Sequence, residues 1–236
     1  LGEVIVFTST LNAAQQNILE NYLSAKFGMA ATTDMYTFEA GHGLGVIGIG
    51  REDATNEHTN SIGNGYVRIS TPSSLSNGDY LFAGHDDVAI GSLSTNVPAS
   101  MPAGTNRFER QWRVEKTGDL GTVTVVFELD AGSNYSGDPA SYTLVVDTDA
   151  DFSDATEFYT GTYNAGAQTV TFTNVDFTTG EFFSLAGDGP GEIISVQDGN
   201  WGDPTTWDCN CIPTCFNDVS LDIGHTVTVD EDAFAK

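Results

Sequence analysis

The chain has 236 residues, of which 39% are hydrophobic and 17% are charged. This length and composition predict a folded chain with a sizeable core and exclude an ordinary disordered tail. Eight Lys and Arg against 33 Asp and Glu give a formal net charge of -25, and such a charge repels phosphate backbones and anionic lipids. We therefore expect no nucleic acid among its partners. We also expect no membrane insertion, because no run approaches the roughly 18 apolar residues of a spanning helix.

The first 30 residues combine a short apolar run with the clearest helix signal of the sequence. The run is Val4 to Phe7, and the helix is predicted over 12–27. Asn12 followed by Gln15 is typical of a capping box, and Gly28 is the expected left-handed stop. We interpret this strand and amphipathic helix as a structural flank or a domain boundary. The chain opens without a leader-like segment and stops just after a strand-like run, which predicts a piece of a longer protein.

The middle of the chain predicts an antiparallel β-sandwich of the Ig-like or jelly-roll kind. Short β-type runs recur every ten to fifteen residues from about 46 to 186, separated by Gly, Asn, Asp, Ser and Pro. Strict alternation of apolar and polar residues, as in 122–125 and 169–173, is typical of strands with one buried face. We assign this domain to residues 31–188. The candidate strands are 66–70, 80–83, 108–114, 122–129, 142–146, 169–173 and 182–185.

A linker-like stretch, Asp188 to Gly191, separates the sandwich from a third segment, 189–236. Its alternating runs predict the start of a further β-rich module. Its three cysteines lie within seven residues of one another, and two of them could close a small disulfide loop in an oxidising compartment. A zinc site is the less favoured alternative, since His225 is the only further ligand at hand. These cysteines are Cys209, Cys211 and Cys215.

The strongest candidate site is a run of alternating aspartates directly after the strand predicted at 142–146. Asp147, Asp149 and Asp151 could turn their carboxylates toward one point, and Asp154 could complete the shell. Calcium takes six to eight oxygen ligands and would relieve the repulsion among these charges. Phe152 stands where an EF-hand needs glycine, so the run is not an EF-hand. The alternative is a solvated acidic turn in a chain that is acidic throughout.

Catalytic motifs are missing from the sequence, so we predict that the chain is not an enzyme. It has no G-x-S-x-G, H-E-x-x-H or Ser-x-x-Lys, and its four histidines are scattered. Gly43 to Gly48 fits G-x-G-x-x-G, but no helix follows, so we interpret it as a glycine-rich strand or bend. His85 with Asp86 and Asp87 is more typical of a polar loop than of an acid-base pair.

Two further features have both a structural and a binding interpretation. Arg110 shares one face of the strand predicted at 108–114 with Trp112, so we expect it to be buried with a carboxylate partner, or else to bind a ligand. Trp201 and Trp207 flank a Gly/Pro-rich turn. They could stack on sugar rings, or they could cover a small core.

Three stretches together carry a resemblance to known domains. The first resembles the last strand and terminal helix of a concanavalin-like, lectin-type jelly roll from large surface proteins of Bacteroidota; it comprises residues 3–7, Leu11 and 20–28. The second is similar to an uncharacterised β-sandwich domain that follows such a jelly roll; it comprises 47–53, 84–86, 110–114, 145–152 and 182–186. The third resembles the opening of a β-rich repeat module; it comprises 199–208, 211–213 and 225–229.

The resemblance implies an extracellular, multidomain protein of the bacterial cell surface, such as an adhesin or a gliding-type filament, exported by the type IX system. Such domains carry no established catalytic residues that could be transferred to this chain. We therefore expect a non-catalytic structural or adhesive module, stabilised by calcium, whose partners are neighbouring domains of the same long chain and possible surface glycans or surface proteins. The alternative is a carbohydrate-binding module attached to a secreted enzyme.

Overall fold

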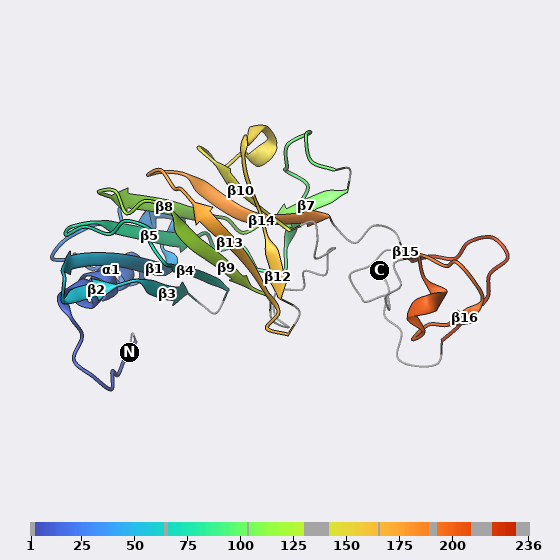
Figure 1. Ribbon diagram of the computed structural model, residues 1–236, viewed down its shortest axis with the longest axis horizontal. Coiled ribbons are helices and arrows are strands. Elements are labelled where there is room, and N and C mark those ends of the chain that lie inside the picture. Colours follow the sequence, from blue (N-terminus) through green and yellow to red (C-terminus); the bar gives the residue numbers. More distant parts are fainter. Residues whose placement is uncertain are drawn as a thin grey trace.

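The computed structural model describes residues 3–63, 66–102, 104–129, 142–164, 166–188, 193–208 and 219–229. It is a mostly β structure in which two antiparallel sheets are stacked, with one long helix near the N-terminus (Figure 1). The prediction of an antiparallel, mostly β fold with an N-terminal helix is therefore confirmed. No helix in the described part of the chain is long and apolar enough to cross a membrane.

The larger sheet has nine strands, seven of which form one continuous path. The short strands β6 (Leu93–Ser94) and β7 (Thr105–Phe108) extend it, because β7 pairs with the end of β14. From edge to edge the path runs through β11 (Glu157–Thr160), β10 (Thr143–Asp147), β14 (Phe182–Asp188), β8 (Trp112–Thr117), β5 (Tyr80–His85), β1 (Leu44–Asp53) and β2 (Asn56–His58).

The smaller sheet has five strands and lies against one face of the larger one. In order they are β12 (Thr162–Asn164), β13 (Thr169–Val175), β9 (Val123–Glu128), β4 (Val67–Ser70) and β3 (Asn60–Gly63). The alternation seen in the sequence holds here, since Val123, Val125 and Phe127 of β9 are buried and the residues between them are half-buried.

The core between the sheets is built on aromatic side chains from both. Trp112 of β8 stacks on Phe183 of β14 at 5.7 Å between ring centroids. The ring of Phe127, from the opposite sheet, meets Trp112 edge-on at 5.4 Å. Such stacked and edge-to-face pairs add to the free energy gained by burying the rings, so this cluster fixes how the two sheets face each other.

The outer face of the larger sheet is covered as well, by two separate groups of residues. Helix α1 (Ala13–Phe27) packs on β1 and β2, and its Ala14 is buried in one cluster with Tyr80 and Phe82 of β5. Farther along the same face, Val145, Phe152 and Phe182 form a second outer cluster around the 3-10 helix η1 (Phe152–Asp154). As a result every residue of β5 is buried, as expected for a strand that is covered on both faces.

Strand β1 explains the glycine-rich run that fits a nucleotide-binding pattern. A Cβ atom on Gly50 would lie 2.1 Å from the ring of Tyr80, and one on Gly48 would lie 2.7 Å from the ring of Phe82. These glycines make room for two aromatic rings that stack at 5.9 Å beneath α1. The interpretation as a glycine-rich strand is confirmed, and no phosphate-binding turn is present at this position.

Two predicted strands are wrong in detail. Residues Val4 to Phe7 form no strand, and Val4 and Val6 are 72% and 83% exposed. Apolar β-branched residues alone do not make a strand, because a strand needs an edge to pair with. The run 108–114 is divided between β7 and β8, since residues 109–111 leave the ladder as the chain moves from the end of β14 to its start.

Helix α1 has the predicted caps and is attached to the sandwich through a buried asparagine. Asn12 and Gln15 form the capping box, and Gly28 closes the helix with φ 63°. Asn21 is 0% exposed. Its Nδ2 donates to the carbonyl oxygens of Asn17 and Thr33, both at 2.9 Å, and its Oδ1 accepts from the amides of Met35 and Tyr36 at 2.7 and 3.0 Å. The boundary predicted at residue 30 stays a prediction, although packing and hydrogen bonds cross it.

The third segment pairs its strands in parallel. Strand β15 (Ile193–Ile194) pairs with β17 (Val219–Ser220), and β16 (Gly199–Asn200) pairs with β18 (Val227–Thr228). Between them lies the 3-10 helix η2 (Pro204–Thr206), capped by Asp203. The parallel ladders distinguish this segment from the antiparallel sandwich, and its assignment as the start of a further module stays a prediction.

We expect Asn21→Ala to lower the free energy of unfolding of the whole sandwich by about 2–4 kcal/mol, because two buried amides lose their acceptor. Urea unfolding followed by tryptophan fluorescence measures the change. Gln16→Ala on the exposed side of the same helix is the control and should stay within about 0.5 kcal/mol of wild type. An unchanged free energy of unfolding in Asn21→Ala would contradict the role of this side chain in attaching α1 to the sandwich.

His42 gives the fold a predictable sensitivity to acid. Both of its ring nitrogens are buried without a hydrogen-bond partner, and its ring meets Phe182 edge-on at 5.2 Å. Burial, followed by the charges of Arg113 and His85, lowers the pKa of His42 from 6.5 to about 4. Its neutral form therefore stabilises the fold above pH 6.5, and this contribution is lost as the pH falls from 6.5 to 4. We expect His42→Leu to retain about 1–2 kcal/mol more of its neutral-pH stability at pH 4 than wild type. Urea titrations at pH 7 and pH 4 measure the free energy of unfolding of both proteins. An equal loss between the two pH values in wild type and His42→Leu would contradict this.

Candidate metal centre

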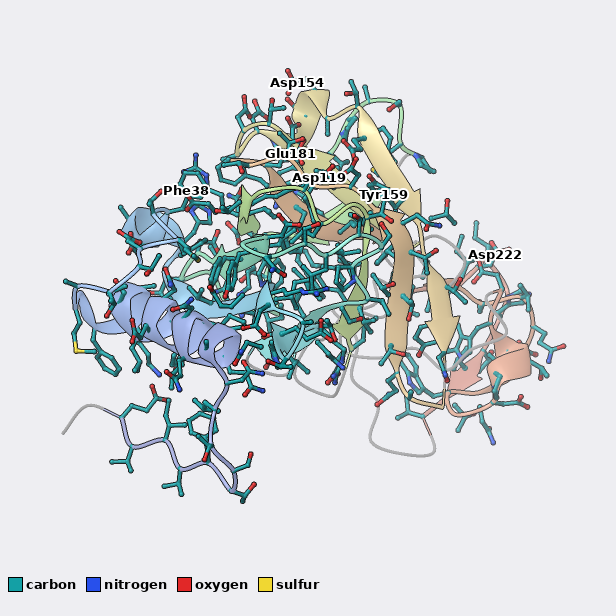
Figure 2. All side chains as sticks on the ribbon, turned by 60° about the vertical axis from the view of Figure 1, so that its left-hand side comes forward. Phe38, Asp119, Asp154, Tyr159, Glu181 and Asp222 are labelled. Carbon is teal, nitrogen blue, oxygen red and sulfur yellow. The ribbon has the colours of Figure 1, made fainter. Side chains whose placement is uncertain are left out.

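The acidic loop, residues 147–154, begins at the last residue of β10 and ends with η1. Strand β10 lies between β11 and β14, which fixes the position of Asp147 at the end of a paired strand. Phe152 is fully buried in the second outer cluster, so η1 is held on the sheet and carries Asp154 outward at its end (Figure 2). The loop is therefore attached to the larger sheet at both ends.

Within the loop, alternate aspartates accept hydrogen bonds from the backbone amide two residues later. The amide of Asp149 lies 3.4 Å from Oδ1 of Asp147, and the amide of Asp151 lies 2.7 Å from Oδ1 of Asp149. The amide of Ser153 donates to Oδ1 of Asp151 at 3.0 Å. Such turns are a local property of aspartate. They explain the spacing, because each of the three carboxylates accepts through Oδ1 from the amide two residues later.

Three of the four predicted ligands come together. Asp147, Asp149 and Asp154 each place one carboxylate oxygen within 4.8 Å of the others. Calcium binds oxygens at about 2.3–2.6 Å, so ligands on opposite sides of one ion lie up to about 5 Å apart. This triad could supply three oxygens of a calcium shell, and other residues and water would supply the remaining ligands. Magnesium, with bonds of about 2.0–2.1 Å, would need the carboxylates to move closer together.

Asp147 is the most telling member of the triad. Its Oδ2 is buried and has no hydrogen-bond partner. Burial raises the pKa of Asp147, and the charges of Asp149 and Asp154 raise it further, while hydrogen bonds from the amides of Thr148 and Asp149 oppose the shift. A buried carboxylate oxygen without a donor is costly unless a proton or a cation satisfies it. Asp147 therefore fits the donor set of a hard cation.

Asp151, the remaining predicted ligand, has a different role and lies outside the triad. It is the N-cap of η1, and its Oδ1 also accepts a hydrogen bond from Nδ2 of Asn96 at 2.7 Å. The bonds from Asn96 and Ser153 lower its pKa. Asp151 therefore caps the turn that carries Asp154, and its role as a metal ligand stays a prediction.

The arginines near the loop also differ from expectation. Arg110 lies in the break between β7 and β8, half-buried, and its Nε donates to the Val88 carbonyl at 2.7 Å in place of a carboxylate. Arg107 is the buried one, with Nε 2.9 Å from the Asn96 carbonyl and its guanidinium 4.3 Å from the centroid of the Phe152 ring. The break in the strand reverses which arginine faces the interior.

The tryptophan pair is only partly available for stacking on a sugar. Trp207 is 2% exposed, and its Nε1 donates to the Trp201 carbonyl at 3.0 Å. Its ring meets that of Trp201 edge-on at 5.1 Å. Trp207 is therefore a core residue of the third segment, and its prediction as a glycan-stacking residue is wrong. Trp201 is half-buried, and its role in stacking on a sugar stays a prediction.

The remaining predicted residues give no further centre. Cys209, Cys211 and Cys215 lie outside the described residues. His225, weighed as a fourth zinc ligand, has its Nδ1 3.0 Å from Oγ of Ser195, a buried serine that also accepts from the amide of Asp222. His85 is buried, with its ring edge-on to Trp112 and Nδ1 facing the Asp86 carbonyl. The Nδ1 atom of His225 also lies 3.0 Å from the Ser195 carbonyl oxygen, so each of the two histidines contacts a main-chain carbonyl.

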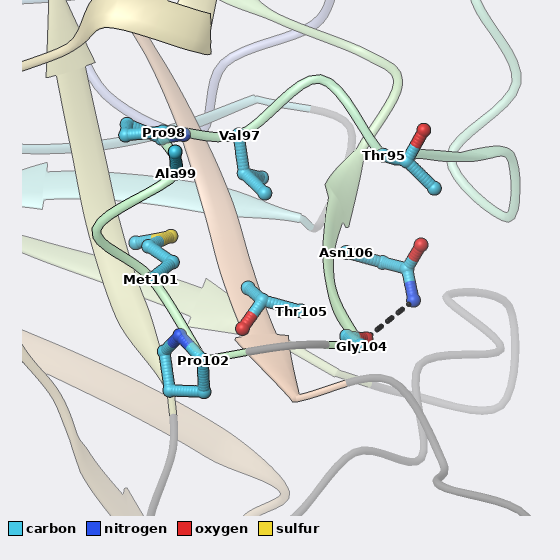
Figure 3. A pocket seen from close by; sticks show the side chains of 9 residues that line it. All are labelled: Thr95, Val97, Pro98, Ala99, Met101, Pro102, Gly104, Thr105 and Asn106. Carbon is cyan, nitrogen blue, oxygen red and sulfur yellow. Dashed lines mark hydrogen bonds between the residues drawn. The ribbon is translucent and has the colours of Figure 1, made fainter.

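A pocket of about 580 Å³ opens beside the segment that carries Asn96. Its walls contain no acidic, basic or histidine side chain among the nine residues drawn in Figure 3. These residues are Thr95, Val97, Pro98, Ala99, Met101, Pro102, Gly104, Thr105 and Asn106. The lining thus offers no side chain that could act as a general acid or base near neutral pH, and none that could activate the hydroxyls of Thr95 and Thr105 as nucleophiles.

Asn96 and Arg107 were missed by sequence reasoning. Asn96 is separated from Asp151 by 55 positions, and nothing in its local sequence marks it. Their part in the site depends on the fold, which places the side chains of Asn96 and Arg107 against the acidic loop.

The fold and the loop define a two-layered β domain with an acidic candidate metal centre on its outer face. The chain belongs to a family described as a domain of unknown function, DUF8202, which matches residues 10–181. This range includes α1 and most of the sandwich, and it includes the acidic loop. No curated protein and no solved structure matches the chain.

Proposed function

We propose that this chain is a non-catalytic structural or adhesive module of a longer cell-surface protein, and that its acidic loop binds calcium. One observation carries the metal part of the proposal: Oδ2 of Asp147 is buried without a hydrogen-bond donor, and the carboxylates of Asp149 and Asp154 face the same point. A hard divalent cation satisfies that oxygen and neutralises the repulsion among the three charges.

Calcium at this position would stabilise the sandwich because the triad spans two parts of it. Asp147 belongs to the paired strand β10, whereas Asp154 lies on η1, whose Phe152 is buried against the outer face. An ion that binds both carboxylates connects the strand to the segment that covers it. A ligand that binds only the folded state raises stability in proportion to its occupancy, so the loop would act as a structural clamp.

The passive role is supported by where the polar groups of the described residues lie. The pocket beside Asn96 has no ionisable lining, and the buried histidines and arginines are engaged with rings and main-chain carbonyls. An extracellular location suits the proposal, since calcium is abundant there and extracellular modules bind it at about 0.1–1 mM. Neighbouring domains of the same long chain are the proposed partners.

We expect about 5 mM calcium to raise the melting temperature by roughly 2–9 °C over EDTA, because a Kd of about 0.1–1 mM makes calcium binding worth about 1–2 kcal/mol at this concentration. Asp147→Asn and Asp149→Asn should abolish most of this shift, because each removes a charged ligand. Asp34→Asn, which removes an exposed charge elsewhere, should leave it intact. Magnesium at the same concentration should act weakly.

Calorimetric titration with calcium under the same conditions gives the affinity directly. The metal centre would be refuted if calcium neither changed the melting temperature of the wild-type protein nor gave a heat of binding. Equal shifts in wild type and Asp147→Asn would place calcium elsewhere on the acidic surface.

A carbohydrate-binding module is the second candidate, and one observation favours it: Trp201 is half-exposed and braced by the ring of Trp207. If sugars bind there, we expect specific signals on a glycan array that fall about fivefold in Trp201→Ala, since an aromatic stacking contact is worth about 1 kcal/mol. Phe158→Ala, on the exposed part of β11, is the control. An array without specific signals leaves the structural role as the proposal.

A further inference from the structure

We propose that Asn96 is the positioning residue of the metal centre: it holds the acidic loop in its binding conformation before the cation arrives. This goes beyond the calcium site, because it concerns how the loop is ordered without metal. The proposal has an affinity part, the effect of Asn96 on calcium binding, which rests on the proposed function. Its loop-order part, the effect of Asn96 on the order of the loop without metal, does not.

Asn96 uses both ends of its side-chain amide on the loop. Its Nδ2 donates to Oδ1 of Asp151 at 2.7 Å, and its Oδ1 accepts from the amide of Phe152 at 2.8 Å. A side-chain amide can donate to a carboxylate and accept from the next backbone amide at once. The bond to Asp151 is charge-assisted, which makes it stronger than a neutral one.

The backbone of Asn96 is held in turn by Arg107 at the end of the larger sheet. Nε of Arg107 donates to the Asn96 carbonyl at 2.9 Å, and Nη1 donates to the Phe108 carbonyl at 2.7 Å. The same guanidinium lies over the ring of Phe152 at 4.3 Å. Asn96 therefore has a fixed position against a paired strand, β7, and against the buried residue that begins η1.

These contacts decide where the triad lies. Asp151 caps η1 and Phe152 begins it, so the two residues that Asn96 binds set the orientation of the short helix that ends at Asp154. Asp147 is fixed independently by β10. The distance between the two carboxylates thus depends on Asn96. Holding a site in its bound geometry in advance reduces the ordering cost that binding would otherwise include.

The test compares Asn96→Ala with Thr95→Ala, a neighbouring exposed position, as the matched control. In EDTA, hydrogen exchange of the Phe152 and Ser153 amides should become roughly tenfold faster in Asn96→Ala, in line with the loss of a hydrogen bond to a charged group. Amides of β9 serve as the internal reference and should not change. In calcium titrations, Asn96→Ala should raise the Kd roughly 5- to 20-fold, and Thr95→Ala should stay within about twofold.

Asn96→Asp is the second variant, since it keeps the size and the acceptor for Phe152 but loses the donor to Asp151. It should also speed exchange at Ser153 in EDTA. Unchanged exchange of the loop amides in both variants overturns the inference, as does faster exchange spread equally over β9. If the loop amides respond as expected but wild type binds no calcium, the proposed metal function fails and only the loop-order part stands. If wild type binds calcium and Asn96→Ala binds it equally well, the affinity part is refuted.

Discussion

Burial of both faces of the larger sheet is the constraint on which the rest of the structure depends. One face packs on the smaller sheet through Trp112, Phe127 and Phe183. The other is covered by α1 at one end and by Phe152 at the other. The acidic loop belongs to the second of these covers. Burial of the Phe152 ring holds η1 on the sheet, and this places the charged groups of the loop beside it.

The sequence was informative about this fold where periodicity was regular. Strand β9 alternates throughout and β13 alternates as far as Phe172, and the capping box of α1 is local. Strand β1 was only half recognised, because its glycines remove the apolar period that marks a strand, and the reason for them, the rings of Tyr80 and Phe82, lies some thirty residues away. The split between β7 and β8 depends on where β14 runs, which no local pattern in 108–114 reveals.

The candidate site could also be predicted from the sequence only in part. Spacing alone identified the loop, since the turns that aspartates form are set by the nearest few residues. It could not separate Asp151, which caps η1, from Asp154, which joins the triad, because a side chain 55 positions away decides between them. Likewise the sequence placed Trp207 beside a turn, and only the packing against Trp201 revealed that its ring is interior.

The parallel ladders of the third segment have a consequence for length. Ile193 pairs with Val219 and Gly199 with Val227, so the backbone returns alongside itself after about 27 residues, as in the coils of solenoid proteins. A sandwich closes its layers on each other and has a fixed size. A coil of parallel strands instead offers a similar rim after every turn, so each added turn makes it one strand spacing, about 4.8 Å, taller. In the described part of the third segment, each two-stranded ladder therefore has an edge on which a further strand would continue the same spacing.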